Sequence, residues 1–346
     1  MKMIITGGAG FIGSNAAEFY AKKKWEVIIF DNLSRKGSNF NKDYLLNTYS
    51  NIKFIKGDIN SPEDMKVLSR QIKNTDLVLH LAAQTAVTYS VLKPVNDFNV
   101  NAKGTLNLLE AVRKIKEDGI NNPIIIYSST NKVYGKMENI KTIKTKKGYN
   151  YIGLRGINEK QNLEFYTPYG CSKGTGDQYM VDYHKIYGLR TVVMRQSCIY
   201  GYRQYGVEDQ GWVAWFMIAN ILNKKVTIYG DGYQVRDLLF VDDLINAYDL
   251  AAKNIKKTSG KFYNIGGGIK NALSVNYFLS ILEKLSGNKI KIKRDNWRPG
   301  DQKVCIMDCS KAKKDFEWEP KMGIKKGIPI LYRWLLKNRK DLQLIY

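Results

Sequence analysis

Residues that commonly hold metals are scarce in this sequence, which has two histidines and four cysteines among its 346 residues. The cysteines, at positions 171, 198, 305 and 309, form no CxxC pair, and only His80 and His184 are available to complete a metal site. This pattern argues against a zinc-finger-like cluster. We expect free thiols, a reducing compartment and no metal, with a disulfide or a metal between Cys305 and Cys309 as the less favoured alternative.

Long apolar runs are also missing. The longest, around Leu77–Ala83 and Ile124–Tyr127, fall far short of the roughly 20 residues that cross a bilayer. The first residues, Met1–Thr6, run directly into a short apolar strand and a glycine turn, without the pattern of a secretion leader. We therefore expect a cytoplasmic enzyme with no membrane partner.

Acidic residues are outnumbered, because 32 Asp and Glu face 55 Lys and Arg, for a net charge of +23. Such an excess raises the question of nucleic-acid binding. The lysines are scattered in short groups along the chain and form no basic arm, which favours a solvated surface and no nucleic-acid partner. A positive field would also attract an anionic nucleotide substrate.

The sequence does contain a regular alternation of β-branched runs and amphipathic stretches through its first two-thirds. Amphipathic helices are expected over Val100–Glu117 and Pro168–Tyr187. The strands expected are Met3–Thr6, Glu26–Phe30, Lys53–Ile55, Leu77–Ala82, Ile124–Ser128 and Thr191–Arg195. The fold class predicted is α/β, a Rossmann-like doubly wound parallel sheet with a smaller C-terminal α/β substrate-binding lobe.

The pattern changes in two places. Between Gly135 and Thr167 the periodicity lapses into a Lys-, Asn- and Gly-rich stretch, which we interpret as a functional flap or an insertion. After Gly201 the helices expected are Trp212–Leu222, Val241–Ala252, Leu273–Leu285 and Ile324–Leu336. We predict a cofactor-binding Rossmann domain over 1–200 and a substrate lobe over 201–346, with a strand and helix near 236–265 returning to the first domain.

A glycine turn, Gly7-Gly8-Ala9-Gly10-Phe11-Ile12-Gly13, follows the first expected strand and opens a helix. Such glycines permit a tight turn and let a pyrophosphate approach the backbone at a helix N-terminus. Asp31 ends the second strand 18 residues after Gly13, close to the ~20 expected for a carboxylate that holds ribose hydroxyls. Because that carboxylate repels a 2′-phosphate, the pattern predicts NAD over NADP. Arg35 is either a cation that softens this preference or a solvent-facing residue.

A tyrosine and a lysine lie four positions apart in Tyr169-Gly170-Cys171-Ser172-Lys173, so both project from one face of the expected helix. A phenol titrates near ~10 in water, but an adjacent ammonium and a positive nicotinamide would stabilise its anion. The pair could then act as a base near neutrality. Because Tyr and Lys at this spacing also occur by chance, the surrounding motifs decide the interpretation.

The fifth expected strand ends in Ser128-Ser129-Thr130-Asn131-Lys132-Val133-Tyr134-Gly135. With the glycine turn and YGCSK, this run resembles the extended short-chain dehydrogenase/reductase (NAD-dependent epimerase/dehydratase) family. The resemblance implies that Thr130, Tyr169 and Lys173 are catalytic, with Thr130 bonding the reacting sugar oxygen while Tyr169 takes its proton. The site expected for a tightly bound NAD comprises Gly7, Gly10, Phe11, Ile12, Gly13, Asp31, Asn32, Ser34, Arg35, Asp58, Ile59, Leu81, Ala82, Ala83, Gln84, Asn101, Ser128, Tyr169 and Lys173.

The two residues after Thr130 bear on the reaction. Dehydratases of this family carry acidic residues there, whereas this chain has Asn131 and Lys132. Without a carboxylic acid, elimination of water lacks its general acid and base. The expected chemistry is oxidation and reduction without loss of a group.

Longer segments, among them GINEKQNLEFYTPYGCSKG, DQYMVDY and DQGWVAWF, resemble the CDP-paratose 2-epimerase (CDP-tyvelose 2-epimerase) group over nearly the whole chain. The resemblance implies inversion of carbon 2 of a CDP-hexose through a 2-keto intermediate, with return of the hydride. It also implies a homodimer or homotetramer paired through the helices of 100–117 and 168–187. Cys198 is a departure, because many relatives have asparagine at this place in their RxxNxYG motif, and Tyr202 is a second one.

The substrate contacts implied by this resemblance include two arginines, whose planar guanidinium can bond two phosphate oxygens at once. The expected contacts are Gln84, Thr85, Thr130, Asn131, Lys132, Ser197, Gln210, Arg236 and Arg298. Four alternatives stay open: inversion of carbon 4 of a UDP-hexose, epimerisation of GDP- or UDP-glucose, a net dehydrogenase or reductase, and an NAD-binding scaffold or RNA-associated protein without turnover.

Overall fold

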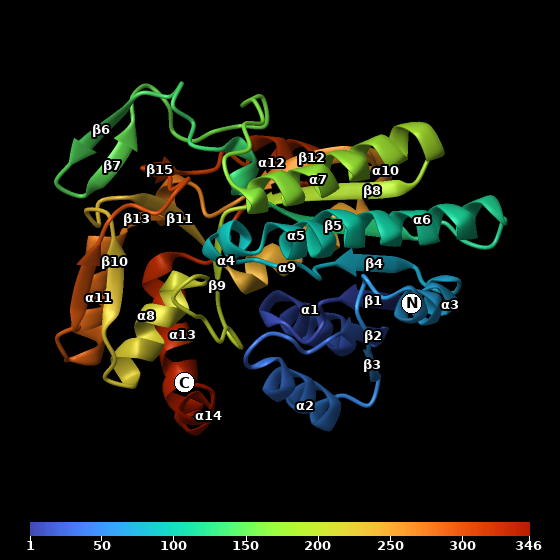
Figure 1. The fold of residues 1–346 in the computed structure, drawn as a ribbon, viewed down its shortest axis with the longest axis horizontal. Coiled ribbons are helices and arrows are strands. Elements are labelled where there is room, and N and C mark those ends of the chain that lie inside the picture. Colours follow the sequence, from blue (N-terminus) through green and yellow to red (C-terminus); the bar gives the residue numbers. More distant parts are fainter.

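The computed structural model describes residues 1–346 and contains a doubly wound α/β fold (Figure 1). Seven parallel strands form the main sheet in the order β12-β8-β5-β4-β1-β2-β3. They are β1 (Lys2–Thr6), β2 (Glu26–Asp31), β3 (Ile52–Lys56), β4 (Leu77–His80), β5 (Ile124–Thr130), β8 (Arg190–Gln196) and β12 (Lys261–Ile265). The predicted fold class is confirmed.

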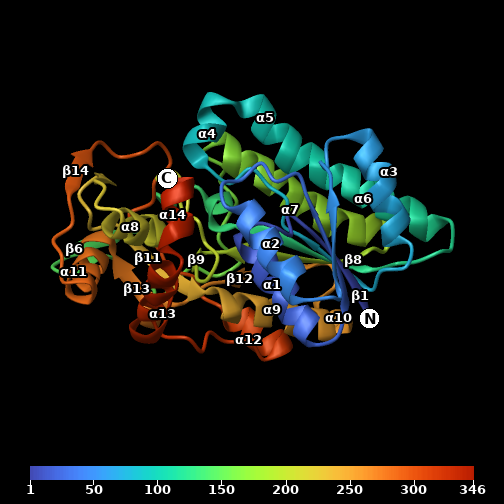
Figure 2. The same cartoon turned by 90° about the horizontal axis from the view of Figure 1, so that it is seen from below.

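Helices cover both faces of this sheet, because successive side chains of each strand point to opposite sides. Met3 and Ile5 of β1 join one hydrophobic core, while Ile4 joins the other. Figure 2 shows α3, α6 and α7 on one side of the strands and α1, α9 and α10 on the other. The helices of this half are α1 (Phe11–Lys22), α2 (Ser38–Thr48), α3 (Pro62–Ile72), α4 (Val87–Leu92), α5 (Pro94–Phe98), α6 (Gly104–Glu117), α7 (Pro168–Tyr187), α9 (Val241–Lys253), α10 (Ile255–Thr258) and α12 (Ser310–Phe316).

A smaller lobe lies beside the carboxyl ends of the main strands (Figure 1). Its central strand, β11, pairs with β9, β13 and β15, and a separate pair joins β10 to β14. The lobe contains β9 (Cys198–Tyr200), α8 (Trp212–Ile221), β10 (Val226–Tyr229), β11 (Val235–Phe240), β13 (Ala272–Ser274), α11 (Val275–Ser286), β14 (Ile292–Asp295), β15 (Val304–Cys305), α13 (Ile324–Lys337) and α14 (Arg339–Ile345).

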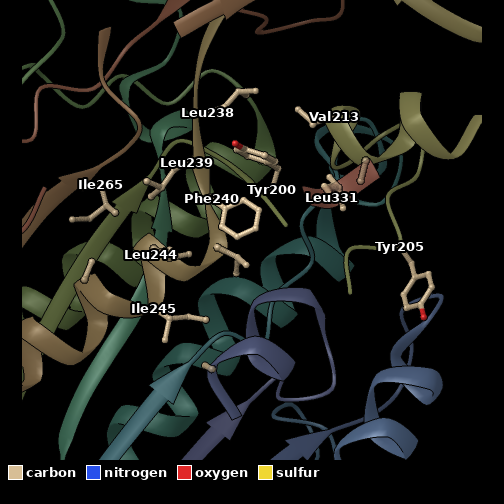
Figure 3. Packing of buried hydrophobic residues seen from close by; sticks show 14 of the residues in the cluster. Tyr200, Tyr205, Val213, Leu238, Leu239, Phe240, Leu244, Ile245, Ile265 and Leu331 are labelled. Carbon is tan, nitrogen blue, oxygen red and sulfur yellow. The ribbon is translucent and has the colours of Figure 1, made fainter. Parts of the chain in front are cut away.

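One hydrophobic core runs from the main sheet into this lobe. The cluster that contains Met3 and Ile5 also contains buried residues of α8, α9, α11 and α13. At the junction the rings of Tyr200 and Phe240 meet edge to face, with centroids 5.3 Å apart (Figure 3). The strand β12 returns to the main sheet beside β8, so the two halves are joined by chain crossings as well as by packing.

The stretch 135–167 contains a β-hairpin that the lapse in periodicity did not predict. Its strands β6 (Thr142–Thr145) and β7 (Gly148–Tyr151) are antiparallel, and the Tyr149 amide donates to the Tyr233 carbonyl of the small lobe at 2.9 Å. None of its residues lines either of the two clefts described below. Of the two interpretations, the structure supports an insertion and contradicts a flap over those clefts.

Other boundaries differ by a residue or two, as helix and strand ends commonly do. The strand β4 ends at His80, and a π-helical turn, Asn99–Lys103, precedes α6. No helix is both long and apolar enough to cross a membrane. The four cysteines are free thiols, of which Cys171 is exposed. No three His, Cys, Asp or Glu side chains converge as metal ligands do.

Candidate active site

The main sheet opens into a cleft of about 610 Å³ lined by the segments that follow its strands. The cleft lies where the strand order reverses between β1 and β4, the usual place for a ligand in such a sheet. Every residue predicted for the cofactor site lines this cleft except Asn101. A volume of this size suits a cofactor or a nucleotide.

The glycine turn between β1 and α1 forms the floor of the cleft. Gly7 has φ of +69°, and a Cβ added there would lie 2.8 Å from the backbone nitrogen of Ala82. The turn therefore brings backbone to backbone where a side chain would not fit. Gly10 caps α1 without a side-chain hydrogen bond, so the first-turn amides of α1 remain free for an anion.

Polar groups gather at the other end of the cleft, after β2 and β3. Asp31 is buried and accepts hydrogen bonds from the amides of Ala9 and Leu33 at 3.0 and 2.8 Å. Burial raises the pKa of its carboxyl above the usual value, although those hydrogen bonds oppose the rise. The carboxylate thus holds the glycine turn and lines the cleft at once.

Arg35 reaches across the cleft instead of facing solvent. Its guanidinium donates to the Gln210 side chain at 2.7 Å, and both residues line the cleft. Gln210 belongs to the segment before α8, so this bond links the segment after β2 to the small lobe. The alternative of a solvent-facing Arg35 is therefore wrong.

The helix α7 places Tyr169 and Lys173 beside the end of β5. Thr167 caps its N-terminus by accepting from the Gly170 amide at 3.2 Å, and Pro168 occupies the first turn, where a missing amide costs nothing. Tyr169 therefore sits in the first turn, where the helix dipole favours an anion. Both side chains are almost fully buried and line the cleft.

The protein by itself does not stabilise the ionised pair. Burial raises the pKa of Tyr169 to about 12, although the nearby Thr130 hydroxyl lowers it in part. Burial also lowers the pKa of the Lys173 ammonium to about 7, against the attraction of Asp177 and Asp97. A further positive charge beside Tyr169 is needed to make it a base near neutrality.

A second, smaller cleft of about 190 Å³ adjoins the first. Thr130 lines the second cleft, while Tyr169 and Ser128 line both. Of the three residues predicted to be catalytic, Tyr169 therefore lies at the junction, with Lys173 in the first cleft and Thr130 in the second. Of the predicted substrate contacts, the clefts bring together Gln84, Thr85, Thr130, Ser197 and Gln210.

Asn101 lies behind the cleft wall. Its side chain accepts from the Gln84 amide at 2.9 Å and donates to the Gln84 carbonyl and to the Ser172 hydroxyl, both at 3.0 Å. It therefore ties the segment after β4 to α7, and its expected direct contact with a cofactor is not seen among the cleft-lining residues.

Four predicted substrate residues line neither cleft. The Asn131 amide donates to the thiol of buried Cys305 at 2.9 Å. Lys132 and Arg236 both approach Asp301, at 3.6 and 2.5 Å. Arg298 lies 3.8 Å above the centre of the Tyr229 ring and donates to the Glu208 carbonyl. These sequence positions face partners in the protein, so their contact with a substrate stays a prediction.

Sequence reasoning missed several residues of the second cleft. Gln196, Cys198, Ile199, Trp212 and Val213 line it. The sequence marks Cys198 only as a departure from a motif, and Trp212 lies inside the DQGWVAWF segment, one of those that carry the resemblance. Its place in a segment that carries the resemblance is the sequence signal that could have pointed to Trp212.

Comparison with known proteins gives a full-length match. The family model described as GDP-mannose 4,6 dehydratase matches residues 4–331. The chain is 44% identical over 340 residues to CDP-paratose 2-epimerase of Salmonella typhi, covering 96% of this chain and 99% of that protein. It is 32% identical to a protein of Methanocaldococcus jannaschii described as a putative UDP-glucose 4-epimerase, covering 98% and 99%.

Solved structures share the fold over almost the whole chain. UDP-glucose 4-epimerase of Thermotoga maritima, solved with UDP-glucose, has a TM-score of 0.81 at 31% identity and covers 98% of this chain and 100% of that chain. UDP-glucuronic acid 4-epimerase of Bacillus cereus, solved with UDP-glucuronic acid and NAD, has a TM-score of 0.83 at 28% identity, with the same coverage.

Proposed function

This chain belongs to the GDP-mannose 4,6 dehydratase family of extended short-chain dehydrogenases, and we propose that within this family it inverts carbon 2 of a CDP-linked hexose. It is an NAD-dependent nucleotide-sugar epimerase. The observation that supports epimerase chemistry is the placement of Tyr169 at the junction of the two clefts, with Lys173 lining the first cleft and Thr130 the second. The full-length identity to a CDP-paratose 2-epimerase supports the choice of carbon and base.

The residues of the larger cleft fit NAD. The glycine turn leaves no room for a side chain beside Ala82, and the first turn of α1 offers free amides to a pyrophosphate. Asp31 would hold the adenosine ribose, with Asp58 and Ile59 bracketing the base. When bound, NAD supplies the acceptor for the sugar hydride and the donor that returns it.

The chain's own residues handle the proton and the orientation. Tyr169 takes the proton of the reacting hydroxyl, and Thr130 donates a hydrogen bond that holds that oxygen. The keto sugar turns its other face within the second cleft, and Tyr169 then returns the proton. Lys173 provides the neighbouring positive charge, and Tyr169 would need the further charge of a bound, oxidised nicotinamide ring to ionise near neutrality.

Dehydration is disfavoured by the residues after Thr130. Asn131 and Lys132 carry an amide and an ammonium in place of a carboxylic acid. Both are also engaged within the protein, since Asn131 bonds the Cys305 thiol and Lys132 bonds the Gly300 carbonyl at 3.2 Å. Membership of a family described by a dehydratase therefore does not extend to elimination of water in this chain.

A second candidate is inversion of carbon 4 of a UDP-hexose. The 4-epimerases among the solved structures favour it, since they share this fold at TM-scores of 0.81 and 0.83. The same three catalytic residues would serve, because the chemistry depends on which carbon faces the nicotinamide. GDP- and UDP-glucose are the other substrates to compare.

The test incubates the purified protein with CDP-, GDP- and UDP-linked hexoses in heavy water and identifies the products by NMR. We expect a CDP-hexose inverted at carbon 2 without deuterium at that carbon, and turnover reduced roughly 10²- to 10⁴-fold in Tyr169→Phe. The control Tyr277→Phe removes an exposed phenol from α11 and should keep normal turnover. Deuterium at the inverted carbon would overturn the hydride mechanism, and inversion at carbon 4 would favour the second candidate.

We also propose that the protein is a cytoplasmic homodimer or homotetramer. Exposed apolar side chains gather on α4 and α5, which pack against α7; they are Val91, Leu92, Val95 and Phe98. Of the two helices expected at the interface, α7 exposes Tyr179 and Ile186, whereas α6 exposes no large apolar side chain. Large exposed apolar groups on adjoining helices are typical of a subunit interface.

A further inference from the structure

The ammonium of Lys173 is held over an aromatic ring. Its Nζ lies 4.0 Å from the centre of the Tyr127 ring, well within the range of a cation–π contact. The Tyr127 ring is fully buried and lines neither cleft. It therefore approaches Lys173 from the interior of the protein and leaves the side of the ammonium that faces the cleft open.

The carboxylates near Lys173 are already engaged by other donors. Asp97 accepts from the Ser172 hydroxyl at 2.5 Å and from the Gln84 amide at 2.7 Å. Asp177 accepts two hydrogen bonds from Arg195, at 2.9 and 2.8 Å. Both carboxylates attract Lys173 at a distance, but the Tyr127 ring is the group directly beneath it.

Tyr127 is fixed in place from several sides. Its hydroxyl donates to the Lys173 carbonyl of α7 at 3.3 Å, and its ring packs against the His80 ring with centroids 5.6 Å apart. On α7, Gly176 leaves room for the hydroxyl, since a Cβ there would lie 2.5 Å from it. A ring held this firmly can set the position of the ammonium above it.

His80 brings no competing charge. Its Nδ1 lies 2.7 Å from the Thr6 hydroxyl and its Nε2 lies 3.1 Å from the Thr105 hydroxyl. Thr105 donates its own proton to the Asn101 carbonyl, so it must accept from Nε2, which leaves Nδ1 to accept from Thr6. Burial lowers the pKa of His80 to about 3, so the ring is neutral at physiological pH.

We propose that Tyr127 is a positioning residue for the epimerase reaction, whose ring face holds the Lys173 ammonium beside Tyr169 and favours its charged form. The proposal rests on the function proposed above. Because burial by itself drives Lys173 toward the neutral amine, an attractive ring face offsets part of that loss. A charged Lys173 in turn favours the Tyr169 anion.

The test replaces Tyr127 with phenylalanine and then with phenylalanines carrying one, two or three ring fluorines. Fluorination withdraws charge from the ring face while nearly preserving its shape, so all the proteins should fold. Lysine labelled with ¹³C at the ε position reports the titration of Lys173 by NMR in the protein as purified. We expect the titration midpoint to fall stepwise, by about one pH unit across the series.

The catalytic readout is the pH profile of kcat/KM. Its acid limb should move to higher pH as fluorines are added, measured against Tyr127→Phe, which has already lost the hydroxyl but retains an unfluorinated ring. The same fluorinated residue at Tyr20, an equally buried position in α1, is the control and should move neither readout. Identical Lys173 midpoints in the unfluorinated and trifluorinated proteins would refute the proposal. Absence of epimerase turnover in the natural protein would refute the proposed function alone, since the NMR titration still decides the Tyr127 contact.

Discussion

At the candidate site, burial shifts the pKa values of two residues in directions that disfavour their charged forms. Burial raises the pKa of Tyr169 and lowers that of Lys173, and both shifts oppose the ion pair that the chemistry needs. A positively charged nicotinamide ring beside Tyr169 would lower the pKa of its phenol and so oppose the first of these shifts. Without that charge the Tyr169 phenol would stay protonated, and therefore unreactive as a base, at neutral pH.

His80 is predicted to make the protein sensitive to acid. Its pKa is about 3 in the folded chain and ordinarily about 6.5, so between these pH values the unfolded chain binds a proton that the folded chain does not. Stability from this residue is complete above pH 6.5 and falls as pH drops toward 3. In His80→Gln the unfolding free energy, measured by denaturant titration, should fall less steeply with acid, by up to about 1.4 kcal/mol per pH unit.

Thr105→Val is the matched control for that experiment. It removes one hydrogen-bond partner of His80 but keeps the histidine, so it should lower stability at every pH without flattening the slope. Equal slopes for the natural protein and His80→Gln would contradict the prediction.

At the scale of elements, the turn between β1 and α1 shows how a backbone shape becomes a binding surface. Gly7→Ala is expected to weaken NAD binding at least 10-fold, because the new Cβ would meet the backbone of Leu81 and Ala82 at 2.8–2.9 Å and displace the turn. Bound NAD per purified chain and the Kd for added NAD measure the effect.

Gly119→Ala provides a matched comparison. Gly119 has φ of +70°, close to that of Gly7, but a Cβ there would meet nothing within 4 Å. Both substitutions carry the strain of a positive φ, which should lower stability by about 1–2 kcal/mol, and Gly7→Ala adds the cost of its backbone clash. If Gly119→Ala weakens NAD binding as much as Gly7→Ala, the steric account of the turn fails.

At the scale of the whole molecule, the apolar face of α4 and α5 bears on assembly. Light scattering should give a mass of two or four chains. The double substitution Leu92→Glu and Val95→Glu should reduce that mass, because it places charge on two apolar side chains that are 75% and 72% exposed in the single chain. The control Leu344→Glu places the same charge on α14, where the leucine is 78% exposed, and should leave the mass unchanged. A monomeric natural protein would rule out the assembly.

Much of the cofactor half could be predicted from sequence, since its signals are local. The glycine turn, the acidic end of β2 and the cap of α7 each lie within a few consecutive residues, and regular strands then carry them to one edge of the sheet. The hairpin at 142–151 was not predicted, because its pairing is stabilised by contacts with the distant β11 and β13. Such contacts produce no alternation of apolar and polar residues in the local sequence.

The sequence by itself determined the fold class and the NAD-type turn, because spacing along a helix or strand sets which side chains share a face. The residues proposed to be catalytic followed from the resemblance of their motifs to a known family. Tertiary structure alone decided that Arg236 and Lys132 converge on Asp301 and that Tyr127 lies beneath Lys173. These pairings join residues far apart in the chain, and their geometry depends on how the lobes and helices pack around them.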